Sequence, residues 1–140
     1  MSARTMQKIH MKLLLLLTFL ALSSRPVCAE WMSFGESGSG TTVYADPTTK
    51  SRDGDLVKMW VLFDFKTAQA KADVTYLSAK AHMEYDCAKP RYEGLTVIYV
   101  SGNMGNGNIL DRSSAKSMWI RISPGTLDHD LWKLACGKRS

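Results

Sequence analysis

The sequence predicts a small α+β domain, in which an antiparallel sheet of about six strands carries one C-terminal helix on one face. Side chains from residue 76 to Cys87 alternate between apolar and polar, which is typical of a long strand with one buried and one solvated face. Residues 127–136 carry apolar side chains at helical spacing. Cys87 ends the strand and Cys136 ends the helix, so a disulfide between them would tie the helix to the sheet.

Residues 1–29 are expected to be a cleaved signal peptide. They contain no acidic residue, and three basic residues precede an apolar run from Leu13 to Leu22, which is followed by Arg25 and by small residues up to Ala29. This order is typical of secretory leaders, and the 10-residue apolar run is too short as a helix to cross a bilayer core of about 30 Å. Cys28 lacks the small or aliphatic residues that precede a lipid-attachment cysteine. We therefore expect cleavage after Ala29 and no stable membrane anchor afterwards.

Removal of this leader changes the charge balance of the protein. The whole chain has 18 basic and 13 acidic residues and a net charge of +5. Four of the basic residues lie in the leader, so residues 30–140 hold 14 basic and 13 acidic residues, a net charge of +1. This near-neutral balance argues against a nucleic-acid partner. The remaining length fits a single domain, and its two cysteines, Cys87 and Cys136, are expected to pair in an oxidising compartment.

Runs of β-branched and aromatic residues predict the remaining strands. Together with the alternating strand at 74–87, they give six segments: 31–35, 41–45, 56–65, 74–87, 91–101 and 116–122.

The segments between these strands are expected to be turns and loops. Asp46 and Pro47 should end the second strand, and residues 50–55 should form a polar turn. Residues 66–73 are predicted to be a wide hairpin loop. The glycine- and asparagine-rich residues 102–108 lack the pattern of a phosphate-binding loop and predict a mobile hairpin tip.

The C-terminal helix has clear start and stop signals. Thr126 is a suitable N-cap, Asp128 and Asp130 lie in the first turn, and Gly137 is suited to end the helix. We expect the helix to lie on the strand face that carries Ala79, Ala81, Met83 and Tyr85. A disulfide closing 49 positions between Cys87 and Cys136 would stabilise the fold by roughly 4 kcal/mol.

No catalytic residue, metal site or cofactor is predicted. His82, Glu84 and Asp86 share one strand face, but neighbouring side chains there are about 6.6 Å apart, which is wide for one metal ion. A His82–Glu84 acid–base pair would lack a nucleophile and an oxyanion loop. Residues 35–39 also lack the last glycine of a hydrolase nucleophile elbow. The preferred interpretation is a solvated polar face on a protein that is not an enzyme.

The sheet face away from the helix is the candidate partner surface. Mixed aromatic and charged groups on a flat face favour a protein partner or a second copy of the chain. The candidate residues are Trp60, Leu62, Lys80, His82, Glu84 and Trp119. The alternative is that the N-terminal strand or a loop folds over them.

An ordered set of motifs resembles the surface-adhesin protein E family of Gram-negative bacteria. The motifs are Val43-Tyr44-Ala45-Asp46, residues 57–62, Glu84-Tyr85-Asp86-Cys87, Tyr99-Val100-Ser101, and residues 119–126 with Cys136. The resemblance covers nearly all of residues 31–136. It implies a six-stranded antiparallel sheet with a C-terminal helix held by the disulfide, and attachment to host extracellular-matrix proteins.

These inferences together predict an exported, non-catalytic binding module of the bacterial envelope that interacts with a protein partner. The expected location is the periplasm, the cell surface or the medium. The alternative is a structural or stress-related periplasmic protein without a fixed ligand.

Overall fold

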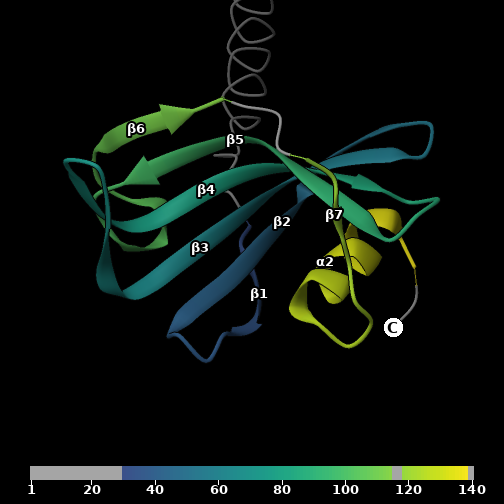
Figure 1. Cartoon of the computed structure of the whole chain (residues 1–140), viewed down its shortest axis with the longest axis horizontal. Helices are drawn as coiled ribbons and strands as arrows, with labels where there is room; N and C mark the ends of the chain where they lie inside the picture. The colour runs from purple at the N-terminus through teal and green to yellow at the C-terminus, as the bar shows by residue number, and fades with distance from the viewer. Residues whose placement is uncertain (1–29, 115–117, 139–140) are drawn as a thin grey trace, which may run out of the picture.

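The computed structural model describes residues 30–114 and 118–138, and Figure 1 shows a curved antiparallel sheet with one short helix against it. The expected leader, residues 1–29, lies outside the described residues. Within the described part of the chain, no helix has both the length and the apolar character needed to cross a membrane.

Six strands follow one another across the sheet in the order of the sequence, and a short seventh strand pairs with the fifth. The strands are β1 (Met32–Glu36), β2 (Thr41–Asp53), β3 (Leu56–Lys71), β4 (Val74–Asp86), β5 (Arg91–Val100), β6 (Ile109–Ser113) and β7 (Ile120–Arg121). A 3-10 turn, η1 (Asn103–Gly105), lies between β5 and β6, and the helix α2 (Leu127–Cys136) ends the fold. The predicted antiparallel sheet with a single C-terminal helix is confirmed.

The sheet has a helix face and an opposite face, and the register of β3 with β4 defines both. Direct pairs such as Val61 with Ala81 and Val57 with Tyr85 lie on the helix face. The core there combines sheet and helix side chains: Val43, Ala45, Val57, Met59, Val61, Tyr85, Ile122, Leu131, Trp132 and Ala135. The alternate pairs, such as Trp60 with His82 and Leu62 with Lys80, lie on the opposite face. The alternating side chains of β4 therefore point to the two faces of the sheet as predicted.

The helix begins and ends where the sequence predicts. The hydroxyl of Thr126 accepts a 3.3 Å hydrogen bond from the amide of His129, and Gly137 has the left-handed φ of 70° that glycine tolerates. Cys87 and Cys136 form the disulfide, which holds the last residue of α2 at the end of β4.

The position of α2 along β4 differs in part from the prediction. Met83 and Tyr85 contact the core that contains the helix, as expected, whereas Ala79 and Ala81 are buried outside that cluster. The disulfide explains the difference, because it holds the helix toward the Cys87 end of the strand.

The prediction that Asp46 and Pro47 end the second strand is wrong. Pairing of β2 with β3 is interrupted after Asp46 and resumes at Ser51. Within the interruption the amide of Thr48 finds a local partner, because it donates a 3.0 Å hydrogen bond to the carboxylate of Asp46. The expected turn at 50–55 is thus mostly strand.

The extension of β2 carries two cations to the end of α2. Lys50 Nζ donates to the carbonyl oxygen of Leu134 at 3.1 Å, and Arg52 Nη2 donates to that of Cys136 at 3.2 Å. These bonds add partners to carbonyl groups in the last turn of the helix, where Leu134 also accepts a 3.4 Å bond from the amide of Gly137. They also place positive charge at the negative end of the helix dipole. The strand extension therefore contributes to holding α2.

Two other predicted boundaries are also wrong. The expected loop at 66–73 is largely a continuation of β3 to Lys71, followed by a tight turn in which Ala72 has φ 49°. The sixth strand along the sheet is Ile109–Ser113 rather than 116–122. Residues 116 and 117 of that expected strand lie outside the described residues, and of the rest only Ile120 and Arg121 form a ladder.

The tip at 102–108 is folded back onto the sheet instead of projecting as a mobile loop. Ser78 Oγ donates to the carbonyl oxygen of Gly102 at 2.5 Å and accepts a 3.0 Å bond from the amide of Gly105. The amide of Met104 donates to the carboxylate of Asp64 at 2.6 Å. The 3-10 turn therefore rests on β3 and β4, on the opposite face.

Candidate functional site

Trp60 and His82 form an aromatic stack at the centre of the opposite face. They are direct cross-strand partners in β3 and β4, so their β-carbons lie close together. The ring centroids are 4.7 Å apart and the ring planes differ by 11°. Both side chains are partly buried, and each retains an accessible part. Two adjacent strands thus hold a flat aromatic surface without help from a loop.

The irregularity in β2 lies directly beside this stack. Asp46 is the last β2 residue to pair with β3 before the interruption, and its partner is Trp60. The amide of Trp60 donates instead to the hydroxyl of Thr49 at 3.0 Å. The backbone of Trp60 is therefore fixed while the regular ladder of β2 is interrupted next to its ring.

The environment of His82 favours its neutral form. Burial lowers the pKa of His82, and the positive charge of Lys58 lowers it further, while Glu84 acts in the opposite direction. The neutral imidazole has one donor and one acceptor nitrogen. The stack therefore combines apolar ring surface with limited hydrogen-bonding capacity.

Two residues of the predicted partner surface have little accessible side chain. Leu62 has 0% of its surface exposed, and its partner across the ladder is Lys80. Glu84 is 8% exposed, pairs across the ladder with the buried Glu93, and lies 3.7 Å from Lys58 Nζ. Lys58 itself keeps 45% of its side chain exposed.

The remaining two predicted residues, Lys80 and Trp119, lie in different surroundings. Lys80 is partly buried against the tip, where a β-carbon added to Gly105 would be 2.1 Å from Lys80 Cε. Trp119 lies apart, next to β7, and its ring is covered by the guanidinium of Arg91 at 4.6 Å. The structure therefore brings Trp60, His82 and Lys58 together and leaves Trp119 in a separate group.

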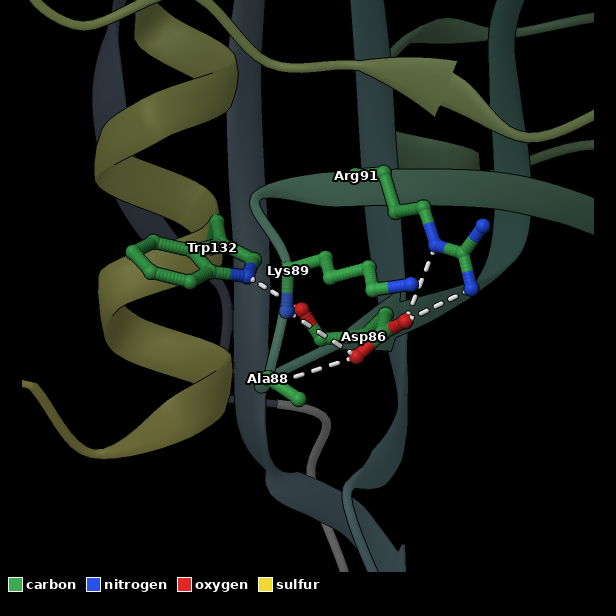
Figure 2. Close-up of polar contacts among 5 residues, drawn as sticks. All are labelled: Asp86, Ala88, Lys89, Arg91 and Trp132. Carbon is green, nitrogen blue, oxygen red and sulfur yellow. Dashed lines mark hydrogen bonds and ion pairs between the residues drawn. The ribbon is translucent and has the colours of Figure 1, made fainter.

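Asp86 holds Arg91 and the turn that follows β4, as Figure 2 shows. Its carboxylate accepts bonds from the amides of Ala88 and Lys89 at 2.9 and 3.1 Å and from Arg91 Nε at 2.9 Å. Arg91 Nη2 lies 2.8 Å from the same carboxylate. Burial alone would raise the pKa of Asp86, but these bonds outweigh it and hold the pKa below its ordinary value.

Sequence reasoning missed an aromatic cluster at the end of the sheet away from the disulfide. Tyr76 makes edge contacts with Phe65 and Tyr99, at centroid distances of 5.6 and 4.8 Å. The ammonium of Lys71 lies 4.1 Å from the centre of the Tyr99 ring and 2.9 Å from the carboxylate of Asp111. The signal for this cluster in the sequence is one aromatic residue in each of three successive strands, but the missed continuation of β3 to Lys71 hid their register.

The Trp60–His82 stack presents a flat, partly accessible aromatic surface on two paired strands. Among residues 30–114 and 118–138, no three His, Cys, Asp or Glu side chains are grouped so that they would hold a metal ion. The two cysteines of this part of the chain are joined in the disulfide, so neither is available as a thiol nucleophile.

Comparisons with known proteins agree with this architecture. The fold is similar to that of a solved structure of protein E from Haemophilus influenzae. The two chains share 12% sequence identity with a TM-score of 0.58, and the match covers 79% of this chain and 88% of that chain. Another, from non-typeable Haemophilus influenzae, has 13% identity, a TM-score of 0.57, and coverage of 83% and 82%. At such identities the likeness concerns the fold.

The sequence comparisons add the family. No curated protein sequence matches the chain. The sequence pattern of the family described as surface-adhesin protein E, however, matches residues 31–137, which include every described strand, the helix and both paired cysteines. This chain therefore belongs to the surface-adhesin protein E family.

Proposed function

We propose that this protein is an exported, adhesin-like binding module of the bacterial envelope that attaches to a protein partner through the Trp60–His82 stack. Membership of the surface-adhesin protein E family supports an adhesin-like surface protein. The secretory pattern of residues 1–29 supports export.

The observation that carries the proposal is the stack itself. Its rings are paired at 4.7 Å on two hydrogen-bonded strands and remain partly accessible on the face that α2 does not cover. Tryptophan is enriched among the residues that dominate protein–protein binding, and a ring that is already ordered loses little entropy on binding. Lys58 would supply a charged rim beside it.

The family suggests the class of partner. A surface adhesin binds molecules outside the cell, so we propose that the Trp60–His82 stack binds an extracellular-matrix protein. The neutral state of His82 favours contact with an aromatic or apolar side chain of such a partner.

Surface plasmon resonance against a panel of purified extracellular-matrix proteins tests this proposal. Trp60→Ala should weaken binding at least about tenfold, because the loss of one central aromatic anchor typically costs 2 kcal/mol or more. Tyr76→Ala removes a partly buried aromatic ring from the other cluster and is the matched control, so it should bind like the wild type. Thermal melts of both variants exclude unfolding as the cause.

Two results would contradict the proposal. Equal weakening by Trp60→Ala and Tyr76→Ala would show that the stack is not the contact surface. If the wild type binds no protein of the panel, the alternative of a structural envelope protein without a fixed ligand is favoured. Light scattering over a range of concentrations identifies the case in which the partner is a second copy of the chain.

A further inference from the structure

A basic cavity lies beside Arg91, where the turn between β4 and β5 meets β7. It has a volume of about 430 Å³ and is lined by Lys89, Pro90, Arg91, Arg121 and Ile122. The turn between β4 and β5 provides Lys89 and Pro90, and β7 is held there because Arg121 pairs with Arg91 and the amide of Ile122 donates to the carbonyl oxygen of Pro90 at 2.8 Å.

The three cationic side chains that line the cavity carry more positive charge than the acidic residues paired with them neutralise. Arg91 and Arg121 are direct cross-strand partners, an arrangement in which like charges destabilise the pairing. Among the described residues, Asp86 is the only acidic group that forms an ion pair with any of the three cations, and it pairs with Arg91. Lys89 and Arg121 are exposed. An anion in the cavity would relieve this repulsion.

Arg91 is fixed in place before any ligand arrives. Its Nε and Nη2 atoms bind the Asp86 carboxylate, whose side chain is 8% exposed, and the Trp119 ring lies 4.6 Å from its guanidinium carbon. Figure 2 shows the side chains of Lys89 and Arg91 running toward the same side of Asp86. Asp86 uses Nε and one Nη2 hydrogen, and no residue in the described part of the chain bonds to Nη1, so the Nη1 donors can bind a ligand.

We propose that this cavity binds a sulfate or phosphate ester carried on a sugar-sized body. Three separate cationic side chains, from the turn, β5 and β7, surround one space. A sulfate or phosphate ester has three terminal oxygens pointing in different directions, so each cation can bind its own oxygen, whereas a carboxylate has only two oxygens in one plane. After neutralisation by Asp86, two positive charges remain, which match the charge of a phosphate monoester.

The size and remaining lining of the cavity indicate the body that carries the anion. Its volume is in the range of small-molecule sites and much larger than a lone inorganic ion requires. Pro90 is exposed and provides apolar surface against which the carbon-bound face of a sugar ring can pack, whereas Ile122 adds little because it is 6% exposed. This inference concerns residues other than the Trp60–His82 stack and does not depend on the function proposed for it.

Three matched probes test the proposal by isothermal titration calorimetry with the mature chain: glucose-6-phosphate, glucose-6-sulfate and glucuronic acid. All three present one anionic group on the same ring. The two esters should bind, and glucuronic acid should bind at least about tenfold more weakly because it lacks the third oxygen. The tighter ester identifies whether a phosphorylated or a sulfated glycan is the natural source, and immobilised heparin then provides a polymeric sulfated ligand.

Arg121→Gln and Lys89→Gln should each weaken ester binding by about tenfold, since each removes one charge-assisted contact. Arg121→Lys keeps the charge but not the planar fork, and should fall between Arg121→Gln and the wild type. Lys66→Gln, at an exposed ion pair with Glu36, is the control and should leave binding unchanged. Melting curves show whether each variant is folded.

Each remaining outcome overturns the inference. It fails if glucuronic acid binds as tightly as the esters, or if neither ester binds. It also fails if the folded Arg121→Gln and Lys89→Gln variants bind like the wild type.

Discussion

The indole nitrogen of Trp132 donates a 2.8 Å hydrogen bond to the backbone carbonyl oxygen of Asp86. This bond joins the middle of α2 to the last residue of β4, one position before the disulfide cysteine. The side chain of the same aspartate fixes the following turn and Arg91. A single residue of β4 therefore connects the helix, the disulfide turn and the basic cavity.

Trp132→Phe should lower the free energy of unfolding by about 2 kcal/mol. The change keeps an aromatic ring in a site that is 7% exposed, but it removes the donor for a buried carbonyl group and leaves some space. Guanidinium denaturation followed by circular dichroism measures the loss. Trp60→Phe, at a partly exposed ring, is the matched control and should cost less, and an equal cost would contradict the role given to the bond.

Replacement of both Cys87 and Cys136 by serine should cost about 4 kcal/mol of stability. The bridge closes a sequence separation of 49, and its loss returns that conformational freedom to the unfolded chain. Hydrogen exchange should then show the earliest loss of protection in α2, because the helix is short and depends on tertiary contacts. Unchanged melting of the double variant would mean that the cations of β2 and the core are sufficient to hold the helix.

The stability of the wild type should fall in acid partly through Asp86. Its pKa is held below the ordinary value in the fold, so its contribution is complete above the unfolded pKa of about 3.9 and is lost as the pH falls through the folded value. Asp86→Asn should be less stable than the wild type by about 2 kcal/mol at neutral pH, and the difference should shrink below pH 4. Urea denaturation at a series of pH values measures this difference.

Asp111→Asn is the control for that experiment. The hydrogen bond from Lys71 also lowers the pKa of Asp111, but this pair is solvent-exposed and should contribute little. If Asp86→Asn and Asp111→Asn lower the free energy of unfolding by the same amount, the surroundings of Asp86 have no special role in acid stability.

His82 should make stability depend on pH in a different window. Burial and Lys58 lower its pKa in the fold, so the unfolded chain binds a proton more readily. Its contribution is therefore complete above the unfolded pKa of about 6.5 and declines as the pH falls toward the folded value. His82→Gln should reduce the fall in melting temperature in this window. If the melting temperatures of the wild type and the variant change in parallel with pH, the fold does not lower the pKa of His82.

The elements predicted from the sequence are those with strong local signals. The alternation of β4 and the caps Thr126 and Gly137 depend on neighbouring residues, so they could be read directly. The extension of β2 past Pro47 and the strand β6 could not. The first depends on hydrogen bonds made inside the interruption, and Ile109–Ser113 has no clean alternation.

The candidate site was predicted in part for the same reason. Parity along two strands placed Trp60 and His82 on one face, and the structure brings them into contact. The docking of the glycine-rich tip onto Asp64 and Ser78 could not be predicted, because it depends on hydrogen bonds between segments far apart in the chain. The basic cavity depends on β7 returning to pair with β5, so Arg91 and Arg121 meet although they are far apart in the chain.

The order of the strands determines how the chain can assemble. Because β1 to β6 are neighbours in the same order as in the sequence, each hairpin can form as soon as its second strand is available. The helix face is completed only by the last stretch of chain, which supplies Leu131, Trp132 and Ala135. A product truncated before residue 127 would keep its sheet-forming segments but leave Val57, Met59 and Val61 uncovered, and it would be prone to aggregation and proteolysis.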